Sequence, residues 1–123
     1  MAHTIEEKQK LLNRVRRANP ALHSHLGVKF HRADNEQILY YEKATPERDN
    51  VILVAVNLDP YRAQEAEFEI PLWEWRLPDD AALHVEDLIH GRSFTWRGKR
   101  QRLRLDPSQL PFALWRVRPE EKP

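Results

Sequence analysis

The first part of the chain has the hydrophobic spacing of one amphipathic helix. Charged residues fill half of positions 5–18, while apolar residues recur near a single helical face: Ile5, Leu11, Leu12 and Val15. Thr4 and Glu7 have the spacing of a capping box, in which each side chain satisfies a free backbone N–H at the helix start. Pro20 disfavours helical angles at the residue before it, so the predicted helix occupies residues 1–18.

After Leu26 the pattern changes to short strands separated by turn residues. The run 51–56 is unbroken, apolar and rich in β-branched residues, which is typical of a strand covered on both faces. Further strands are predicted at 28–31, 38–43, 67–72, 84–88, 93–97, 101–105 and 112–117. About eight short strands with frequent turns predict a mainly β fold, an antiparallel β-sandwich over residues 19–118 with one N-terminal α-helix. Residues 119–123 form a polar tail that is expected to fray.

The segment 92–104 is strongly basic, with six cationic residues and no acid. Gly98-Lys99 separates two of the predicted strands, which predicts a β-hairpin. In this hairpin Phe94 and Trp96 face the same side as Leu103 and Leu105, and three arginines (Arg100, Arg102 and Arg104) line the other face. The strict alternation favours a solvated face over a site for an anionic partner. Docking of the arginines against another domain is a third interpretation.

Composition excludes several classes of protein. The chain has 20 Lys and Arg against 19 Asp and Glu, whereas a nucleic-acid-binding domain usually has a large basic excess. It contains no cysteine, so neither disulfides nor thiolate metal sites are expected. No apolar stretch approaches the roughly 20 residues of a membrane span. The N-terminus lacks the apolar core of a secretory signal, so a cytoplasmic location is expected.

The candidate binding residues are two tryptophans, Trp73 and Trp75. Sugars bind flat aromatic faces through their C–H surfaces, so exposed tryptophans here would form a platform for an α-glucan, while the same spacing would equally place them against a neighbouring domain. Trp96 and Trp115 lie in predicted strands and are expected to pack in the core or at an interface.

No metal or cofactor site is predicted. Among the six histidines the closest pair, His23 and His25, has too few neighbouring ligands for zinc, which needs three or four. None of the three serines lies in a Gly-x-Ser-x-Gly elbow, and three glycines are too few for a phosphate-binding glycine loop.

A succession of short blocks resembles the C-terminal β-domain of the α-1,4-glucan:maltose-1-phosphate maltosyltransferases, in the α-amylase clan (glycoside hydrolase family 13). The blocks span most of the chain: Asn19-Pro20-Ala21-Leu22, Phe30-His31, the run from Val51 to Asn57-Leu58-Asp59-Pro60, Asp87-Leu88, Gly91, Trp96-Arg97-Gly98, Leu105-Asp106-Pro107 and Leu114-Trp115-Arg116-Val117. The sequence departs from the family after Pro60, where Tyr61-Arg62 replaces the more usual His-His. The resemblance implies that residues 1–18 correspond to the last helix of a catalytic barrel.

The resemblance also implies that this chain has no catalytic residue. Retaining glycosyl transfer uses two carboxyl groups about 5 Å apart. In the family they lie on barrel strands, upstream of every segment present here, and the transfer needs no metal or organic cofactor. Asp59 is interpreted as a turn residue whose carboxylate accepts nearby backbone N–H groups.

Three hypotheses remain open from the sequence. The first is a non-catalytic domain that stabilises the catalytic barrel of a maltosyltransferase-like enzyme of α-glucan metabolism. The second is a stand-alone carbohydrate-binding module that uses Trp73 and Trp75. The third is a protein-interaction domain that binds its partner through the N-terminal helix. That helix either associates with a second copy or folds back on the sandwich, and association is the preferred expectation.

Overall fold

The computed structural model describes residues 5–23, 28–46, 48 and 50–119. In these ranges the chain forms one α-helix, one short 3-10 helix (Pro20–Leu22) and eight strands: α1 (Ile5–Ala18), β1 (Val28–His31), β2 (Ile38–Ala44), β3 (Val51–Asn57), β4 (Gln64–Glu69), β5 (Ala82–Asp87), β6 (Arg92–Arg97), β7 (Arg100–Leu105) and β8 (Phe112–Pro119). The predicted mainly β fold with one N-terminal helix is therefore confirmed. No helix among these residues has the length and apolar character needed to cross a membrane.

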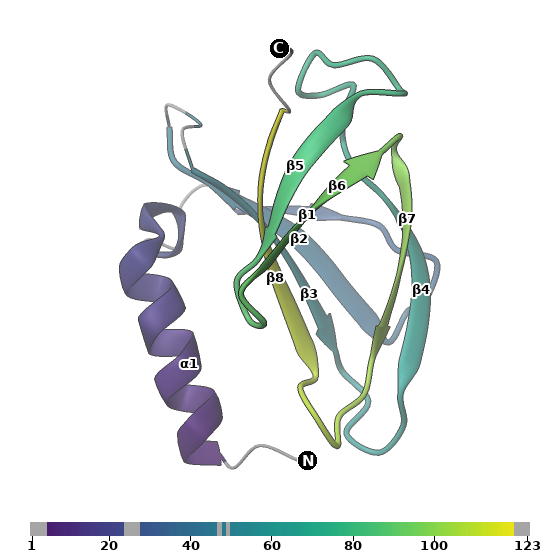
Figure 1. Cartoon of the computed structure of the whole chain (residues 1–123). Coiled ribbons are helices and arrows are strands. Elements are labelled where there is room, and N and C mark those ends of the chain that lie inside the picture. The colour runs from purple at the N-terminus through teal and green to yellow at the C-terminus, as the bar shows by residue number, and fades with distance from the viewer. Residues whose placement is uncertain (1–4, 24–27, 47, 49, 120–123) are drawn as a thin grey trace.

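The described strands form two sheets that face each other. The larger sheet has the order β1-β2-β3-β8-β5-β6, the smaller consists of β4 and β7, and every neighbouring pair is antiparallel. Figure 1 shows α1 and the β4–β7 pair on opposite sides of the larger sheet. The molecule thus has three layers, with the larger sheet in the middle.

Aromatic side chains fill the space between the two sheets. Phe68 of β4 stacks on Trp115 of β8, with ring centroids 5.6 Å apart and an interplanar angle of 8°. Tyr40 and Trp96 meet the same phenylalanine edge-on, at 4.9 and 5.8 Å. Offset-stacked and edge-to-face pairs of this kind add to the stabilisation that burial alone provides. Trp96 and Trp115 were expected in the core or at an interface; Trp115 is buried in the core and the partly buried Trp96 packs against it.

Strand β3 is covered on both faces, as the apolar run predicted. Leu53 and Ala55 point into the core between the sheets, whereas Ile52 and Val54 point to the outer face. On that outer face they pack with Val15 of α1, which is 6% exposed. The helix therefore docks within its own chain. Association with a second copy stays a prediction.

A buried amide holds the end of the helix on the sandwich. Asn19 follows α1 and is 1% exposed. Its Nδ2 donates to the carbonyl of Val15 (2.9 Å), and its Oδ1 accepts from Nδ2 of Asn50 (3.2 Å). Asn50 Oδ1 in turn accepts the backbone N–H of Ala21 (2.9 Å). These bonds satisfy polar groups that would otherwise be buried without partners. The Thr4 part of the predicted capping box lies outside the described residues.

The predicted hairpin of residues 93–97 and 101–105 is wrong. Strand β6 pairs with β5 in the larger sheet, and β7 pairs with β4 in the smaller one. The chain crosses between the sheets at Gly98, where φ is +79°. A two-residue turn would have placed Arg97 opposite Arg100, and like charges directly opposite are destabilising. Trp96 and Leu103 do share one core, but from opposite sheets.

Charge complementarity explains the observed pairing of β4 and β7. Three cross-strand pairs oppose a glutamate and an arginine: Glu65 with Arg104, Glu67 with Arg102 and Glu69 with Arg100. Such opposite-charge pairs stabilise an antiparallel ladder. Several strand boundaries differ from the expected ranges, most by one residue, and β8 extends to Pro119, which was expected in the tail. β4 ends at Glu69, before Pro71 removes a donor from the ladder, and β5 begins two residues before His84.

A charge on the outer face of β3 should destabilise the fold severely. Val54→Asp would place an unpaired carboxylate between Ile52, Leu114 and α1, where Val54 is 4% exposed. We expect the free energy of unfolding to fall by about 4 kcal/mol, measured by urea denaturation. Thr95→Asp, at an exposed position of β6, is the control and should stay within about 0.5 kcal/mol of the parent. Equal stability of the two variants would contradict the placement of this strand.

Removing α1 should expose the outer face of the larger sheet. A chain that starts at Asn19 would uncover Ile52, Val54 and Leu114, which are each at most 6% exposed. We expect a lower melting temperature and concentration-dependent association, measured by calorimetry and light scattering. The full chain with Arg14→Ala, on the exposed side of α1, is the control and should behave as the parent. Identical melting and a monomeric truncated chain would show that the helix does not brace the sheet.

Candidate functional site

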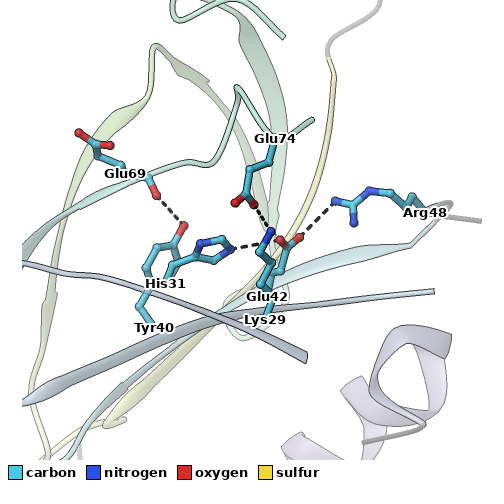
Figure 2. A network of polar contacts seen from close by, with 7 residues as sticks. All are labelled: Lys29, His31, Tyr40, Glu42, Arg48, Glu69 and Glu74. Atoms are coloured by element: carbon cyan, nitrogen blue, oxygen red, sulfur yellow. Dashed lines mark hydrogen bonds and ion pairs between the residues drawn. The ribbon is translucent and has the colours of Figure 1, made fainter. Parts of the chain in front are cut away.

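A buried carboxylate marks the edge of the sandwich where β1 and β2 pair. The burial pattern of β2 alternates, so Glu42 points inward with Tyr40 and its side chain is 3% exposed. His31 Nε2 lies 3.1 Å from Glu42 Oε1, and Arg48 Nη2 donates to Glu42 Oε2 at 3.2 Å. Figure 2 shows these groups converging on Glu42. A buried charge requires such partners, because desolvation otherwise favours its neutral form.

Two opposing effects act on the pKa of Glu42. Burial raises the pKa, since it penalises the charged form, but the hydrogen bonds from His31 and Arg48 and the Arg48 charge outweigh it and leave the pKa below its ordinary value. Arg48 reaches this position from a backbone with φ of +58°, an uncommon value for a residue with a side chain. Its guanidinium also lies 5.8 Å from the ring centroid of Trp75.

The same region contains three side chains of types that bind metals. One ligand atom each from His31, Glu42 and Glu74 lies within 4.8 Å of the others. However, Glu74 Oε2 is 2.7 Å from Lys29 Nζ, and Glu42 already pairs with Arg48. The two carboxylates and the two cations balance, so a metal ion would have to displace Lys29. The arrangement therefore fits an internal ion network better than a metal site.

Sequence reasoning missed this network because its members come from three separated segments. His31 and Glu42 become neighbours only through the β1–β2 register, which pairs Lys29 with Glu42 and His31 with Tyr40. Glu74 arrives from the turn after β4. The histidine pair considered from the sequence is not part of this cluster: His23 is exposed, and His25 lies outside the described residues.

The structure separates the two tryptophans that were predicted to contact a glucan. Trp73 is 72% exposed and lines a cavity of about 460 Å³. Trp75 is half-buried, packs against the core and lines a different cavity of about 330 Å³ with Arg48. They do not form a joint platform, so glucan contact stays a prediction that concerns Trp73 above all.

The Asn57-Leu58-Asp59-Pro60 block forms a tight turn. Asp59 Oδ1 accepts the N–H groups of Tyr61 and Arg62 at 2.9 and 3.2 Å, which confirms its interpretation as a turn residue. These bonds, led by the one from Tyr61, hold the pKa of Asp59 below its ordinary value. Asn57 Nδ2 donates to the carbonyls of Arg62 and Leu105 at 2.9 and 3.0 Å and so joins this turn to β7.

The basic face of β7 has counter-ions on the neighbouring strand. Arg100 lies 4.0 Å from Glu67 and 3.7 Å from Glu69, and Arg104 lies 3.8 Å from Glu65. These side chains are all between 44% and 69% exposed. The arrangement supports a solvated face rather than a site for an anionic partner.

The buried Glu42 should make stability depend on pH. Glu42→Gln removes the charge that faces Arg48, and we expect it to lower the free energy of unfolding by about 2 kcal/mol at pH 7. Since the folded pKa is depressed, this contribution is present above the ordinary Glu value of 4.5 and is lost as pH falls through the folded pKa. Urea denaturation at a series of pH values should therefore show a constant difference between parent and variant above pH 4.5 that shrinks as the pH falls below it. Glu36→Gln, at an exposed position, is the control, and a pH-independent difference would contradict the assignment.

Comparison with known proteins gives relatives along most of the chain. The family model described as GLGE, C-terminal, matches residues 30–117. The alpha-1,4-glucan:maltose-1-phosphate maltosyltransferase of Pseudomonas aeruginosa is 56% identical over 107 residues, which cover 87% of this chain and 16% of that protein. The protein of the same name from Cereibacter sphaeroides is 47% identical over 113 residues, covering 92% and 17%. The chain thus spans about a sixth of the length of these relatives.

Solved structures of glycoside hydrolases share the fold. An alpha-amylase from Anoxybacillus superposes with a TM-score of 0.57 at 12% identity, over 92% of this chain and 22% of that one. An alpha-amylase from Geobacillus thermoleovorans, complexed with acarbose, gives 0.57 at 15% identity, covering 91% and 22%. These likenesses concern the fold alone; the family match over residues 30–117, with relatives at 47–56% identity, shows that the chain belongs to the C-terminal domain family of the maltosyltransferases.

Proposed function

We propose that this chain is a non-catalytic domain that stabilises the catalytic barrel of a maltosyltransferase. The observation that carries the proposal is coverage: the chain keeps 47–56% identity to enzymes of that name over only 16–17% of their length. The parent protein would transfer maltosyl units from maltose 1-phosphate to α-1,4-glucan, a reaction of glycogen biosynthesis in the cytoplasm. Residues 1–18 would be the last helix of the barrel and residues 19–118 the sandwich.

The direction in which the pKa values of the carboxyl groups are shifted supports a non-catalytic role. Glycosyl transfer with retention needs a general acid whose pKa is raised, about 5 Å from a second carboxylate. Among the residues that the structure describes, the carboxyl groups with a clearly shifted pKa are Glu42, Asp59 and Asp106. All three pKa values are lowered, because accepted hydrogen bonds outweigh burial. These groups stabilise turns and a buried ion network and are poor proton donors.

The position of α1 supports attachment to an upstream domain. Val15 binds the outer face of the larger sheet, and the Asn19–Asn50 bonds fix the helix end to the sandwich. A helix held this firmly would transmit the orientation of a barrel to the sandwich. The same docking makes the adaptor hypothesis less favourable, since Val15 is buried against the sheet and Leu11 and Leu12 are partly buried there.

The isolated chain should show no glycosyl transfer. We expect no turnover with maltose 1-phosphate and glycogen, or with maltooligosaccharides, in an assay for released phosphate and chain length. The full-length P. aeruginosa relative serves as the positive control. Turnover that follows the purified chain and disappears on substitution of one of its own acids would overturn the proposal. The length of the natural reading frame gives an independent test, since the proposal requires one several times longer.

A further inference from the structure

The cavity beside Trp73 has the composition of a polysaccharide subsite. We propose that it binds an α-1,4-glucan chain on the surface of the domain, with one glucosyl ring stacked on Trp73 and its hydroxyl groups hydrogen-bonded to Glu67, Glu69 and Arg100. The choice of an α-1,4-glucan as the ligand rests on the proposed function. The presence of a sugar subsite rests on the geometry described below.

The walls of the cavity come from three adjoining segments and from Arg100 of β7. The residues that follow β1 meet β4 through a bridge between Ala33 and Phe68, and Glu67 donates its N–H to Asp34 Oδ1 at 2.7 Å. The turn after β4 closes the third side with Pro71, Trp73 and Glu74. The resulting volume of about 460 Å³ lies in the lower part of the range for small-molecule sites, which suits a short stretch of a longer chain.

The turn presents Trp73 to solvent. Leu72, just before it, and Trp75, two residues after it, pack inward; Leu72 is 0% exposed, whereas Trp73 is 72% exposed. The backbone between them is closed by bonds from Trp75 N to Leu72 O (3.0 Å) and from Arg76 N to Trp73 O (3.2 Å). Large aromatic side chains are usually buried, so an indole held outward by an ordered turn is a ready surface for the C–H face of a sugar.

The polar groups on the cavity wall match a neutral ligand with many hydroxyls. Arg100 lies 4.0 Å from Glu67 and 3.7 Å from Glu69, so these ion pairs are loose and leave donors and acceptors available. Carboxylates accept hydrogen bonds from sugar hydroxyls, and guanidinium groups donate to them. The lining has more carboxylates than cations, which disfavours a sugar phosphate or another anion in this position.

The ion network around Glu42 holds the residues of this cavity wall in place. Tyr40 donates its hydroxyl to the carbonyl of Glu69 (3.0 Å), and Lys29 holds Glu74 at 2.7 Å (Figure 2). His31, which lines the cavity, is bonded to the buried Glu42. The wall is therefore organised before a ligand arrives, as binding sites require.

The cavity also lies away from the helix. It is formed where β1 of the larger sheet meets β4 of the smaller sheet, whereas α1 covers the opposite side of the larger sheet (Figure 1). If a catalytic domain that precedes α1 lies on the helix side, Trp73 remains accessible in the full-length protein. It would then hold a glucan near the enzyme while the end of the glucan is extended elsewhere.

The test is affinity electrophoresis of the 123-residue chain in native gels that contain glycogen, with dextran gels as the linkage control. We expect glycogen, but not dextran, to retard the parent chain, and Trp73→Ala to weaken the apparent affinity at least about fivefold. Arg100→Ala should weaken it as well. Tyr61→Ala is the matched control, because Tyr61 is 88% exposed but belongs to the turn at Asp59, outside this cavity. Unchanged melting temperatures would show that the variants are folded.

Three results would overturn the subsite. They are absence of retardation of the parent chain at high glycogen concentration, a Trp73→Ala variant that binds like the parent, and equal losses for Trp73→Ala and Tyr61→Ala. Equal retardation by dextran would overturn the α-1,4 assignment. None of these outcomes affects the proposed function, which fails only through turnover by the isolated chain or a short natural reading frame.

Discussion

The fold depends on one strand that has to be covered on both faces. Alternate residues of β3 point to opposite sides of the larger sheet, and both sets are apolar. The small sheet covers Leu53 and Ala55, and α1 covers Ile52 and Val54. Neither layer alone removes the strand from water, and burial of each such side chain contributes about 1.5–3 kcal/mol. The three-layer arrangement therefore follows from the six consecutive apolar residues 51–56 and the need to exclude water from them.

This constraint explains why much of the fold was predictable. The β3 run is visible in the sequence as an unbroken apolar segment, and the helix ends at Ala18 because Pro20 restricts the residue before it. In the three-layer arrangement each apolar face of the larger sheet is covered, one by the smaller sheet and the other by α1. What the sequence pattern does not state is which strands share a sheet, because period-two alternation is the same whether two strands pair side by side or face each other across a core.

The strands β6 and β7 show this limit clearly. Their core-facing residues Trp96 and Leu103 fit equally well in one hairpin or in two opposed sheets, and proximity in sequence favoured the hairpin. The deciding signal was the charge pattern, since Arg100, Arg102 and Arg104 find three glutamates on β4. Opposite charges directly across a ladder stabilise it, whereas Arg97 would have opposed Arg100 in a hairpin. Complementary charge runs far apart in the sequence can thus indicate strand pairing better than turn residues do.

Only part of the candidate site could be predicted from the sequence, again because the pattern of residue types does not state which segments come together. Trp73 could be singled out from its type and position, but its separation from Trp75 depends on a turn that sends one ring outward and the other into the core. The network around Glu42 depends on strand register and on a residue from a distant turn, so no local pattern indicates it. Both features share one edge of the sandwich, where Glu74 follows Trp73 directly and pairs with Lys29.

The ion network around the buried Glu42 therefore also affects the surface. The ion pair between Lys29 and Glu74 belongs to this network, and it holds the turn that carries the exposed Trp73. A domain that braces a catalytic barrel through its helix needs only the outer face of the larger sheet. The hydrogen bonds and ion pairs that hold the cavity wall on the opposite side are not required for that task. They favour the binding of a ligand there.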